Sequence, residues 1–390
     1  ASATFDELCN SLNCTVNAGY PSAGQYFADQ SNGSYRPQFD VFGPVTLSRN
    51  VAYYGTDGSE EGDDQHATDA VVEGCRLANE QFNINWADYD SDNDGYVDFV
   101  YVIYAGKGQA DGGTSETIWP HNWSVESARY YGNCTYQAAQ CIVGGKKLDN
   151  YAMSSEMSGN SLGGIGTLCH EFGHVMGLPD FYATNQASHR TLGSWDIMDY
   201  GPYNNNGNTP PNYSAFERWF MGWIEPTLLN TACSVTLPPL QDSKAACLIT
   251  ESGQGISDIL LPLPSTFYLL ENRQKKGWDA YIKSSGMMIT KVQWSQNKWA
   301  NNTVNNTSSK LGVDIIEATP NSSSYTDKAT DLYPNGATEF TKVANYQVTN
   351  IDMQNRIVTF DVNGGGEALM LDVGNVQSDD VQCTKVLYNG

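Results

Sequence analysis

The segment His170-Glu171-Phe172-Gly173-His174 has the residue types and the spacing of a catalytic zinc site. On a helix, two histidines four residues apart share one face, so both imidazoles can reach the same ion. Zinc accepts neutral nitrogen ligands tetrahedrally, and a catalytic centre keeps one position open for water. A glutamate beside that water can take its proton as it attacks a carbonyl carbon. We therefore expect His170 and His174 to be zinc ligands and Glu171 to be the general base.

Two residues downstream extend this motif to the pattern H-E-x-x-H-x-x-G-x-x-[HD]. Gly177 can adopt the left-handed backbone conformation that ends a helix and reverses the chain. Asp180 follows six residues after His174, where a sharp turn could return its carboxylate to the metal. Asp180 is therefore the expected third ligand. The alternatives are that its carboxylate caps a turn or orients a histidine, or that Glu217 is the third ligand.

A second segment, residues 193–201, resembles the tight methionine turn that lies beneath the zinc site in metzincin peptidases. By this resemblance, the Met198 thioether would pack under the histidine rings without binding the metal. Some metzincins place a tyrosine two residues later, where it points at the zinc and stabilises the oxyanion. The resemblance therefore gives Tyr200 a catalytic role, and the alternative is an aromatic residue at the rim of the cleft.

These motifs together resemble the immune inhibitor A family of secreted metallopeptidases, also called cowrins, within the metzincins. The resemblance covers roughly residues 20–365, and it is carried by residues 94–98, 104–106, 118–121, 170–182, 193–198, 268–274 and 277–279. It implies a metzincin-type catalytic domain with a metal-activated water, followed by a β-rich domain. The family usually has a strand and a pro-segment before the position of Ala1, so we expect that activation cleavage or trimming has removed them here.

An acidic loop over residues 90–98 has the alternating carboxylates of a calcium site. Carboxylates at alternate positions point inward, Gly95 permits a sharp turn, and Tyr96 offers its carbonyl oxygen. An EF-hand would have glutamate where this chain has Tyr101, so the loop is not an EF-hand. The pattern predicts a structural Ca²⁺ ion, and the alternative is an exposed acidic turn. The predicted ligands are Asp90, Asp92, Asp94, Tyr96 and Asp98.

The composition is that of an acidic globular protein. The 390 residues include 44 acidic and 21 basic side chains, giving a net charge of -23, which disfavours nucleic acid and anionic membranes as partners. No apolar run is long enough for a transmembrane helix. Among nine cysteines, three pairs lie close in sequence and predict local disulfides of an oxidising compartment: Cys9 with Cys14, Cys134 with Cys141, and Cys233 with Cys247. We expect a secreted or cell-surface monomer.

Hydrophobic periodicity predicts an α+β fold with an antiparallel, β-sandwich-like domain in its second part. The resemblance implies that the first domain is a metzincin-like catalytic domain with a twisted sheet and an active-site helix. The expected domains are residues 1–226 and 227–365, with a C-terminal tail over 366–390. Helices are expected over 66–82, 160–177 and 212–223, with Ser214 capping the last. Strands are expected at 96–105, 118–123 and 148–156, and 112–119 is assigned by analogy as the edge strand above the cleft.

The sequence therefore predicts a zinc-dependent endopeptidase that acts on proteins or peptides. Within enzymes, the alternative is an aspzincin-like or gluzincin-like peptidase with a different third ligand. Outside enzymes, the alternative is a calcium-dependent binding or adhesion protein with an inactive protease fold. The intact Glu171 disfavours this second alternative, because an inactive site has no need of the base.

Overall fold

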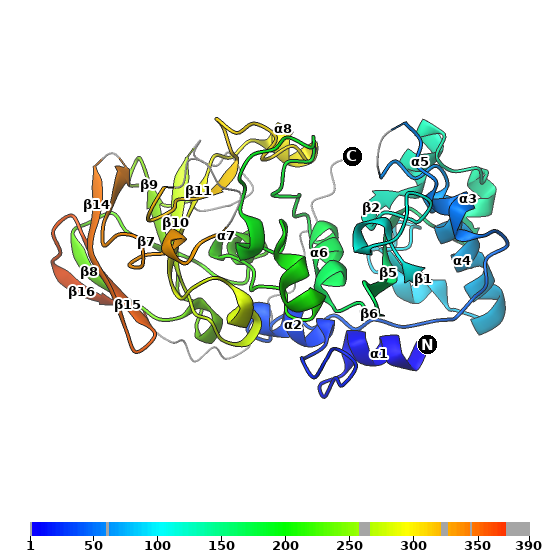
Figure 1. The fold of residues 1–390 in the computed structure, drawn as a ribbon, viewed down its shortest axis with the longest axis horizontal. Coiled ribbons are helices and arrows are strands. Elements are labelled where there is room, and N and C mark those ends of the chain that lie inside the picture. Colours follow the sequence, from blue (N-terminus) through cyan, green and yellow to red (C-terminus); the bar gives the residue numbers. More distant parts are fainter. Residues whose placement is uncertain (1, 60–61, 257–265, 321–326, 344, 372–390) are drawn as a thin grey trace. The chain divides into compact units, whose positions relative to one another are not determined.

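A computed structural model of the chain describes residues 2–59, 62–256, 266–320, 327–343 and 345–371 (Figure 1). The chain divides into two compact units. The first unit contains residues 1–23, 38–175 and 206–208, and the second contains residues 24–37, 176–205 and 209–390. These units are compact parts of the chain and are not domains shown to fold separately. The predicted domain boundaries after residues 226 and 365 therefore stay predictions.

A small mixed sheet organises the first unit. Its strand order is β1-β5-β2, in which β1 runs parallel to β5 and β2 runs antiparallel to it. The helix α4 buries Val71 and Val72 completely, in one core with Tyr151 and Met153 of β5. The elements are α1 (Ser2–Asn10), α3 (Val51–Gly55), α4 (Ala67–Phe82), η1 (Trp86–Tyr89), β1 (Val100–Lys107), η2 (Gln109–Asp111), β2 (His121–Ser124), α5 (Val125–Tyr131), η3 (Ala138–Cys141), β3 (Ile142–Val143), β4 (Lys146–Lys147), β5 (Asn150–Ser158), β6 (Ser161–Leu162) and α6 (Gly166–Val175).

The helix and strands predicted for this unit are present, but their bounds differ in places. The predicted helix over 66–82 is α4. The strands predicted at 96–105, 118–123 and 148–156 are β1, β2 and β5, which start later, at Val100, His121 and Asn150. The helix predicted over 160–177 starts later, because Ser161 and Leu162 pair with β5 as β6. The edge strand predicted at 112–119 is wrong. These residues form turns, since their backbone N–H groups bond locally, as from Gly113 to the Gly108 carbonyl at 2.8 Å.

Two five-stranded sheets share the core of the second unit (Figure 1). The sheet β12-β11-β10-β9-β7 contributes Leu270 and Ile289, and the sheet β13-β14-β15-β8-β16 contributes Val348 and Phe360. Most neighbours are antiparallel, as predicted for the region after residue 226, but the pairs β7–β9 and β16–β8 are parallel. The helices and 3-10 turns are α2 (Ala23–Gln30), η4 (Gly193–Trp195), η5 (Gly201–Gly207), α7 (Ala215–Phe220), η6 (Leu240–Asp242), η7 (Gly277–Tyr281), α8 (Gln296–Ala300) and η8 (Ala329–Asp331). The strands are β7 (Thr227–Leu228), β8 (Cys233–Leu237), β9 (Cys247–Thr250), β10 (Phe267–Arg273), β11 (Gly286–Val292), β12 (Val313–Ile315), β13 (Phe340–Val343), β14 (Tyr346–Gln354), β15 (Ile357–Val362) and β16 (Glu367–Met370).

The predicted local disulfides are absent from the part of the chain that the structure describes. Its eight cysteines are free thiols, and Cys383 lies outside the described residues. Sequence proximity does bring the predicted pairs near one another. The Cys134 and Cys141 thiols are hydrogen-bonded, and the members of the other two pairs lie close enough to interact electrostatically. Close spacing therefore placed these paired sulfur atoms near one another, but a covalent bond also requires oxidation, which spacing does not supply.

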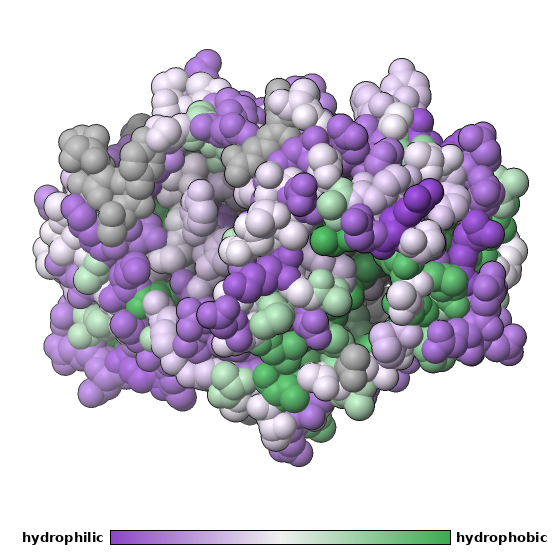
Figure 2. All heavy atoms as spheres, turned by 45° about the vertical axis from the view of Figure 1, so that its right-hand side comes forward, coloured by the Kyte–Doolittle hydropathy of each residue, from purple (hydrophilic) through white to green (hydrophobic). Residues whose placement is uncertain are grey.

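Polar side chains dominate the surface, as the net charge leads one to expect. Figure 2 shows hydrophilic residues over most of the visible face, with apolar residues in smaller patches. Within the described residues, none of the helices combines the length and the apolar character needed to cross a bilayer.

Candidate active site

The helix α6 carries both histidines of the zinc motif and the glutamate between them. It lies against β5 and β2, with His170 and Glu171 buried. Phe172 points into an aromatic cluster, with ring centroids 5.3 Å from Phe39 and 5.8 Å from Phe99. This contact fixes the rotation of the helix about its axis, because Phe172 and the histidines project in different directions from a helix.

The three side chains meet within the first unit. One ligand atom from each of His170, Glu171 and His174 lies within 4.8 Å of the others. The two imidazole rings are 4.8 Å apart between centroids, at an interplanar angle of 83°. Two nitrogen donors one helical turn apart, with a carboxylate beside them, match the donor set of a catalytic zinc centre. The arrangement therefore fits a zinc ion held by His170 and His174.

Tyr101 on β1 lies near Glu171 and was not singled out by the sequence. Burial, and then the negative charge of Glu171, raise the pKa of the Tyr101 hydroxyl well above its ordinary value. That hydroxyl donates to Ser154 Oγ on β5 at 2.8 Å. The tyrosine therefore stays protonated beside the carboxylate. Its position in an almost unbroken apolar strand predicted only a core residue.

In the second unit, the segment after Gly177 is held firmly. Gly177 has φ of +94°, the left-handed conformation predicted for the chain reversal. The Asp180 side chain is 4% exposed. Its backbone N–H donates to Asn302 Oδ1 at 2.7 Å, and its Oδ2 accepts from Asn302 Nδ2 at 2.7 Å. The Asn302 amide thus holds both the backbone and the carboxylate of Asp180.

Met198 lies in a buried turn of the same unit, directly bonded to the Asp180 segment. Asp196 Oδ1 accepts the Met198 N–H at 2.8 Å, and the Met198 carbonyl accepts the Phe181 N–H at 2.7 Å. Gly193 begins the turn with φ of +62°, and a Cβ atom there would lie 2.5 Å from the carboxylate of Asp327. Both features favour glycine at this position, because another residue would be strained there. The side chain of Tyr200, by contrast, is 61% exposed.

A buried ionic cluster supports this turn from β10. Arg273 is 1% exposed, and it bonds the Asp279 carboxylate at 2.6 and 2.7 Å and Glu271 at 3.2 Å. Its Nη2 also donates to the carbonyl of Trp195 at 3.4 Å. Burial alone would lower the pKa of Arg273, but the charges of Asp279 and Glu271 raise it, so the guanidinium keeps its charge.

Of the predicted site residues, the structure brings His170, Glu171 and His174 together. Asp180 and Tyr200 belong to the second unit, and their approach to the histidines stays a prediction. Glu217, the alternative third ligand, forms a capping box at the start of α7: its Oε2 accepts the Ser214 N–H at 2.6 Å, and Ser214 caps the helix as predicted. A capping role accounts for Oε2 of Glu217 without a metal.

The acidic loop over residues 90–98 forms a compact cluster in the first unit. Carboxylate oxygens of Asp90, Asp92 and Asp98 lie within 4.8 Å of one another. Asp94 is not part of this group, and its Oδ1 accepts the Tyr96 N–H at 2.8 Å. The ammonium of Lys146 forms an ion pair with Asp90 and lowers its pKa. A cation at this cluster would therefore share Asp90 with Lys146.

Comparison with known proteins matches the first part of the chain. A family model described as "Immune inhibitor A peptidase M6, catalytic domain" matches residues 8–224. Immune inhibitor A of Bacillus thuringiensis subsp. alesti is 30% identical over 218 residues, which cover 50% of this chain and 31% of that protein. Pre-pro-metalloprotease PrtV of Vibrio cholerae serotype O1 (strain M66-2) is 27% identical over 222 residues, which cover 52% of this chain and 23% of that protein. The chain thus aligns with less than a third of either relative.

Proposed function

Since this chain belongs to the immune inhibitor A peptidase family M6, we propose that it is a zinc-dependent endopeptidase that hydrolyses peptide bonds of proteins. The observation that carries the proposal is the group formed by His170, Glu171 and His174, whose ligand atoms lie within 4.8 Å of one another. The name of the relative PrtV, a metalloprotease, supports the same reaction class.

His170, His174 and Asp180 would hold the zinc ion. When bound, zinc polarises a carbonyl group and lowers the pKa of water, which supplies a nucleophile at neutral pH. The two histidines present imidazole nitrogens from one face of α6. The order of the motif supports Asp180 as third ligand, because Gly177 reverses the chain before it. The carboxylate of Asp180 is also fixed in direction by Asn302.

Glu171 would act as the general base. Its carboxylate takes a proton from the attacking water and passes it to the amine that leaves when the peptide bond breaks. The Tyr101 hydroxyl stays protonated beside it, so it brings no second negative charge to the site. Tyr200 would donate a hydrogen bond to the carbonyl oxygen as negative charge develops there. The exposure of Tyr200 leaves its ring accessible to a substrate.

We also propose that the enzyme acts outside the cell or at its surface, as a monomer on protein or peptide substrates. The net charge of -23 is consistent with soluble protein or peptide substrates, and it disfavours binding to anionic polymers and anionic membranes. Resemblance to a family of secreted peptidases supports the location.

Removal of zinc should abolish proteolysis reversibly. Full-length protein is treated with a chelator, dialysed, and assayed for metal content and for cleavage of casein. We expect one zinc per active chain, loss of cleavage in the depleted protein, and recovery on adding zinc but not calcium. Full cleavage by zinc-depleted protein would overturn the proposal. Tight zinc binding without any cleavage, even after proteolytic activation, would favour a binding protein with an inactive protease fold.

A structural calcium ion at the 90–98 loop is a second proposal. The converging oxygens of Asp90, Asp92 and Asp98 support it, and calcium prefers such oxygen ligands. Asp94 would be a weaker calcium ligand than the sequence pattern predicted, because its carboxylate accepts a hydrogen bond from the Tyr96 N–H. Tyr96 would contribute its carbonyl oxygen.

Calcium should raise the thermal midpoint of the wild-type protein but not that of Asp92→Asn. An ion that binds only the folded state stabilises it by about 2.7 kcal/mol at a concentration 100 times its Kd. The control is Asp88→Asn, which removes a nearby acid that bonds Asn85 and lies outside the cluster. Scanning calorimetry with and without calcium makes the measurement. An equal calcium response in Asp92→Asn and in the control would exclude this loop as the site.

A further inference from the structure

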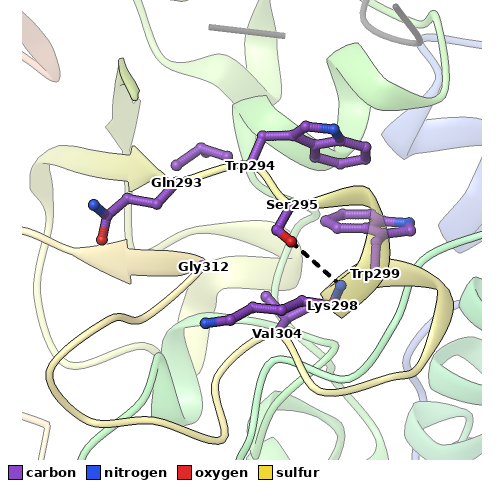
Figure 3. A pocket seen from close by; sticks show the side chains of 8 residues that line it. Gln293, Trp294, Ser295, Lys298, Trp299, Val304 and Gly312 are labelled. Atoms are coloured by element: carbon purple, nitrogen blue, oxygen red, sulfur yellow. Dashed lines mark hydrogen bonds between the residues drawn. The ribbon is translucent and has the colours of Figure 1, made fainter. Parts of the chain in front are cut away.

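The helix α8 and the loop after it hold the segment that contains Asp180, within the second unit. The Trp299 indole Nε1 donates to the carbonyl of Gly177 at 2.9 Å, at the point where the chain reverses. The same indole lies 5.9 Å from Phe181 and 5.1 Å from Phe220 between ring centroids. Figure 3 shows Trp299 on α8 beside Trp294, with Ser295 capping the helix through its bond to the Lys298 N–H.

Asn302, two residues after α8, contacts Asp180 in a way that only a primary amide allows. Its Oδ1 accepts the Asp180 N–H and its Nδ2 donates to Asp180 Oδ2, both at 2.7 Å. The backbone donor fixes which side of the amide is oxygen, since an N–H group must meet an acceptor. Asn302 has φ of +51°, a left-handed conformation that asparagine tolerates better than other non-glycine residues.

Neighbouring bonds make this amide a rigid support. The Asn302 carbonyl accepts from Thr184 Oγ1 at 2.7 Å, so the loop is also bonded beyond Asp180. Asn305 is fully buried, and its Nδ2 donates to the carbonyls of Phe181 and Val313 at 2.7 and 2.8 Å. The loop is thus pinned on both sides of Asn302, and the amide has little freedom to turn away from the carboxylate.

We infer that Asn302 is a positioning residue for the proposed zinc ligand Asp180. The inference rests on the proposed function. A carboxylate that binds a metal must be held in one rotamer, and outer partners that hold it are commonly worth 10- to 100-fold in metal affinity. A neutral amide suits this role, because it orients the carboxylate without a formal positive charge that would compete with the cation for it. This contact joins residues 122 apart, and no motif in the sequence predicts it.

Asn302→Gly is the informative variant, because glycine accepts the left-handed backbone and removes only the amide. We expect the zinc Kd, measured by competition with a chelating dye, to rise about 10- to 100-fold. Cleavage should fall at limiting zinc and recover as zinc is raised, with KM for the peptide little changed. Asn306→Ala is the matched control. Its amide lies in the same loop and bonds Thr184, so its zinc Kd should match that of the wild type.

The outcomes separate this inference from the proposed function. If Asp180→Ala binds zinc as tightly as the wild type, the ligand assignment itself fails. If Asp180→Ala weakens binding but Asn302→Gly resembles Asn306→Ala, only the positioning role is overturned. A thermal midpoint of the zinc-free variant close to that of zinc-free wild type shows that weaker binding is not loss of the fold. Should Asn302→Gly fail to fold, Asn302→Ser offers the same comparison, since its hydroxyl is too short to span both Asp180 atoms.

Discussion

Replacing Glu171 with glutamine should lower kcat for peptide hydrolysis by about 10²- to 10⁴-fold, the usual contribution of a general base. Glutamine has nearly the same size and shape as glutamate, so it leaves the packing of α6 intact. Its amide cannot take a proton from water at neutral pH. His170 and His174 are unchanged, and the zinc content of the variant should therefore equal that of the wild type. Steady-state cleavage of a fluorogenic peptide, with metal analysis of the same sample, makes the measurement.

Glu80→Gln is the matched control, because Glu80 lies exposed on a helix of the same unit. It should keep wild-type kcat and zinc content. A Glu171→Gln variant with wild-type kcat would show that another group takes the proton, and it would remove Glu171 from the proposed mechanism. Loss of zinc from the variant would instead show that Glu171 is itself a ligand.

Local helix geometry explains why the sequence could predict that some site residues are neighbours. His170 and His174 meet because a helix brings residues four apart to one face, which needs no knowledge of the rest of the fold. The helix α4 was predictable for the same reason, since its apolar residues repeat with the helical period. The resemblance to the immune inhibitor A family is confirmed by the match over residues 8–224.

What the sequence could not predict depends on contacts between distant residues. Tyr101 lies near Glu171 because β1 pairs with β5, and an almost unbroken run of β-branched and aromatic residues does not reveal which side chain faces a site. Asn302 reaches Asp180 across 122 residues, and its loop had no catalytic motif. The wrong strand at 112–119 came from analogy with related folds. Residues 112–119 form turns instead, because their backbone groups hydrogen-bond to nearby residues and not to a neighbouring strand.

The largest effect on stability is expected at Arg273. This residue, Asp279 and Glu271 are each at most 1% exposed, so the cluster has almost no solvent to replace a lost partner. The charges of such a cluster do not by themselves stabilise the fold, because removing them from water costs about as much free energy as their mutual attraction returns. Its sensitivity is one-sided. Deleting the Arg273 guanidinium leaves two buried carboxylates without their hydrogen-bonded cation, next to the carbonyl of Trp195 that leads into the Met198 turn.

Arg273→Met should therefore lower the free energy of unfolding by about 3–5 kcal/mol, the cost of breaking a buried ion pair from one side. Methionine keeps much of the length and apolar volume of the arginine stem, so the loss reports the charge more than a cavity. Arg356→Met removes the comparable pair with Asp242, whose side chains are 41% and 38% exposed, and it should cost less than about 1 kcal/mol. Urea unfolding of both variants, followed by tryptophan fluorescence, measures the difference. Equal losses in the two variants would contradict the role assigned to burial, because each variant removes one positive charge, from a buried cluster in Arg273→Met and from an exposed pair in Arg356→Met.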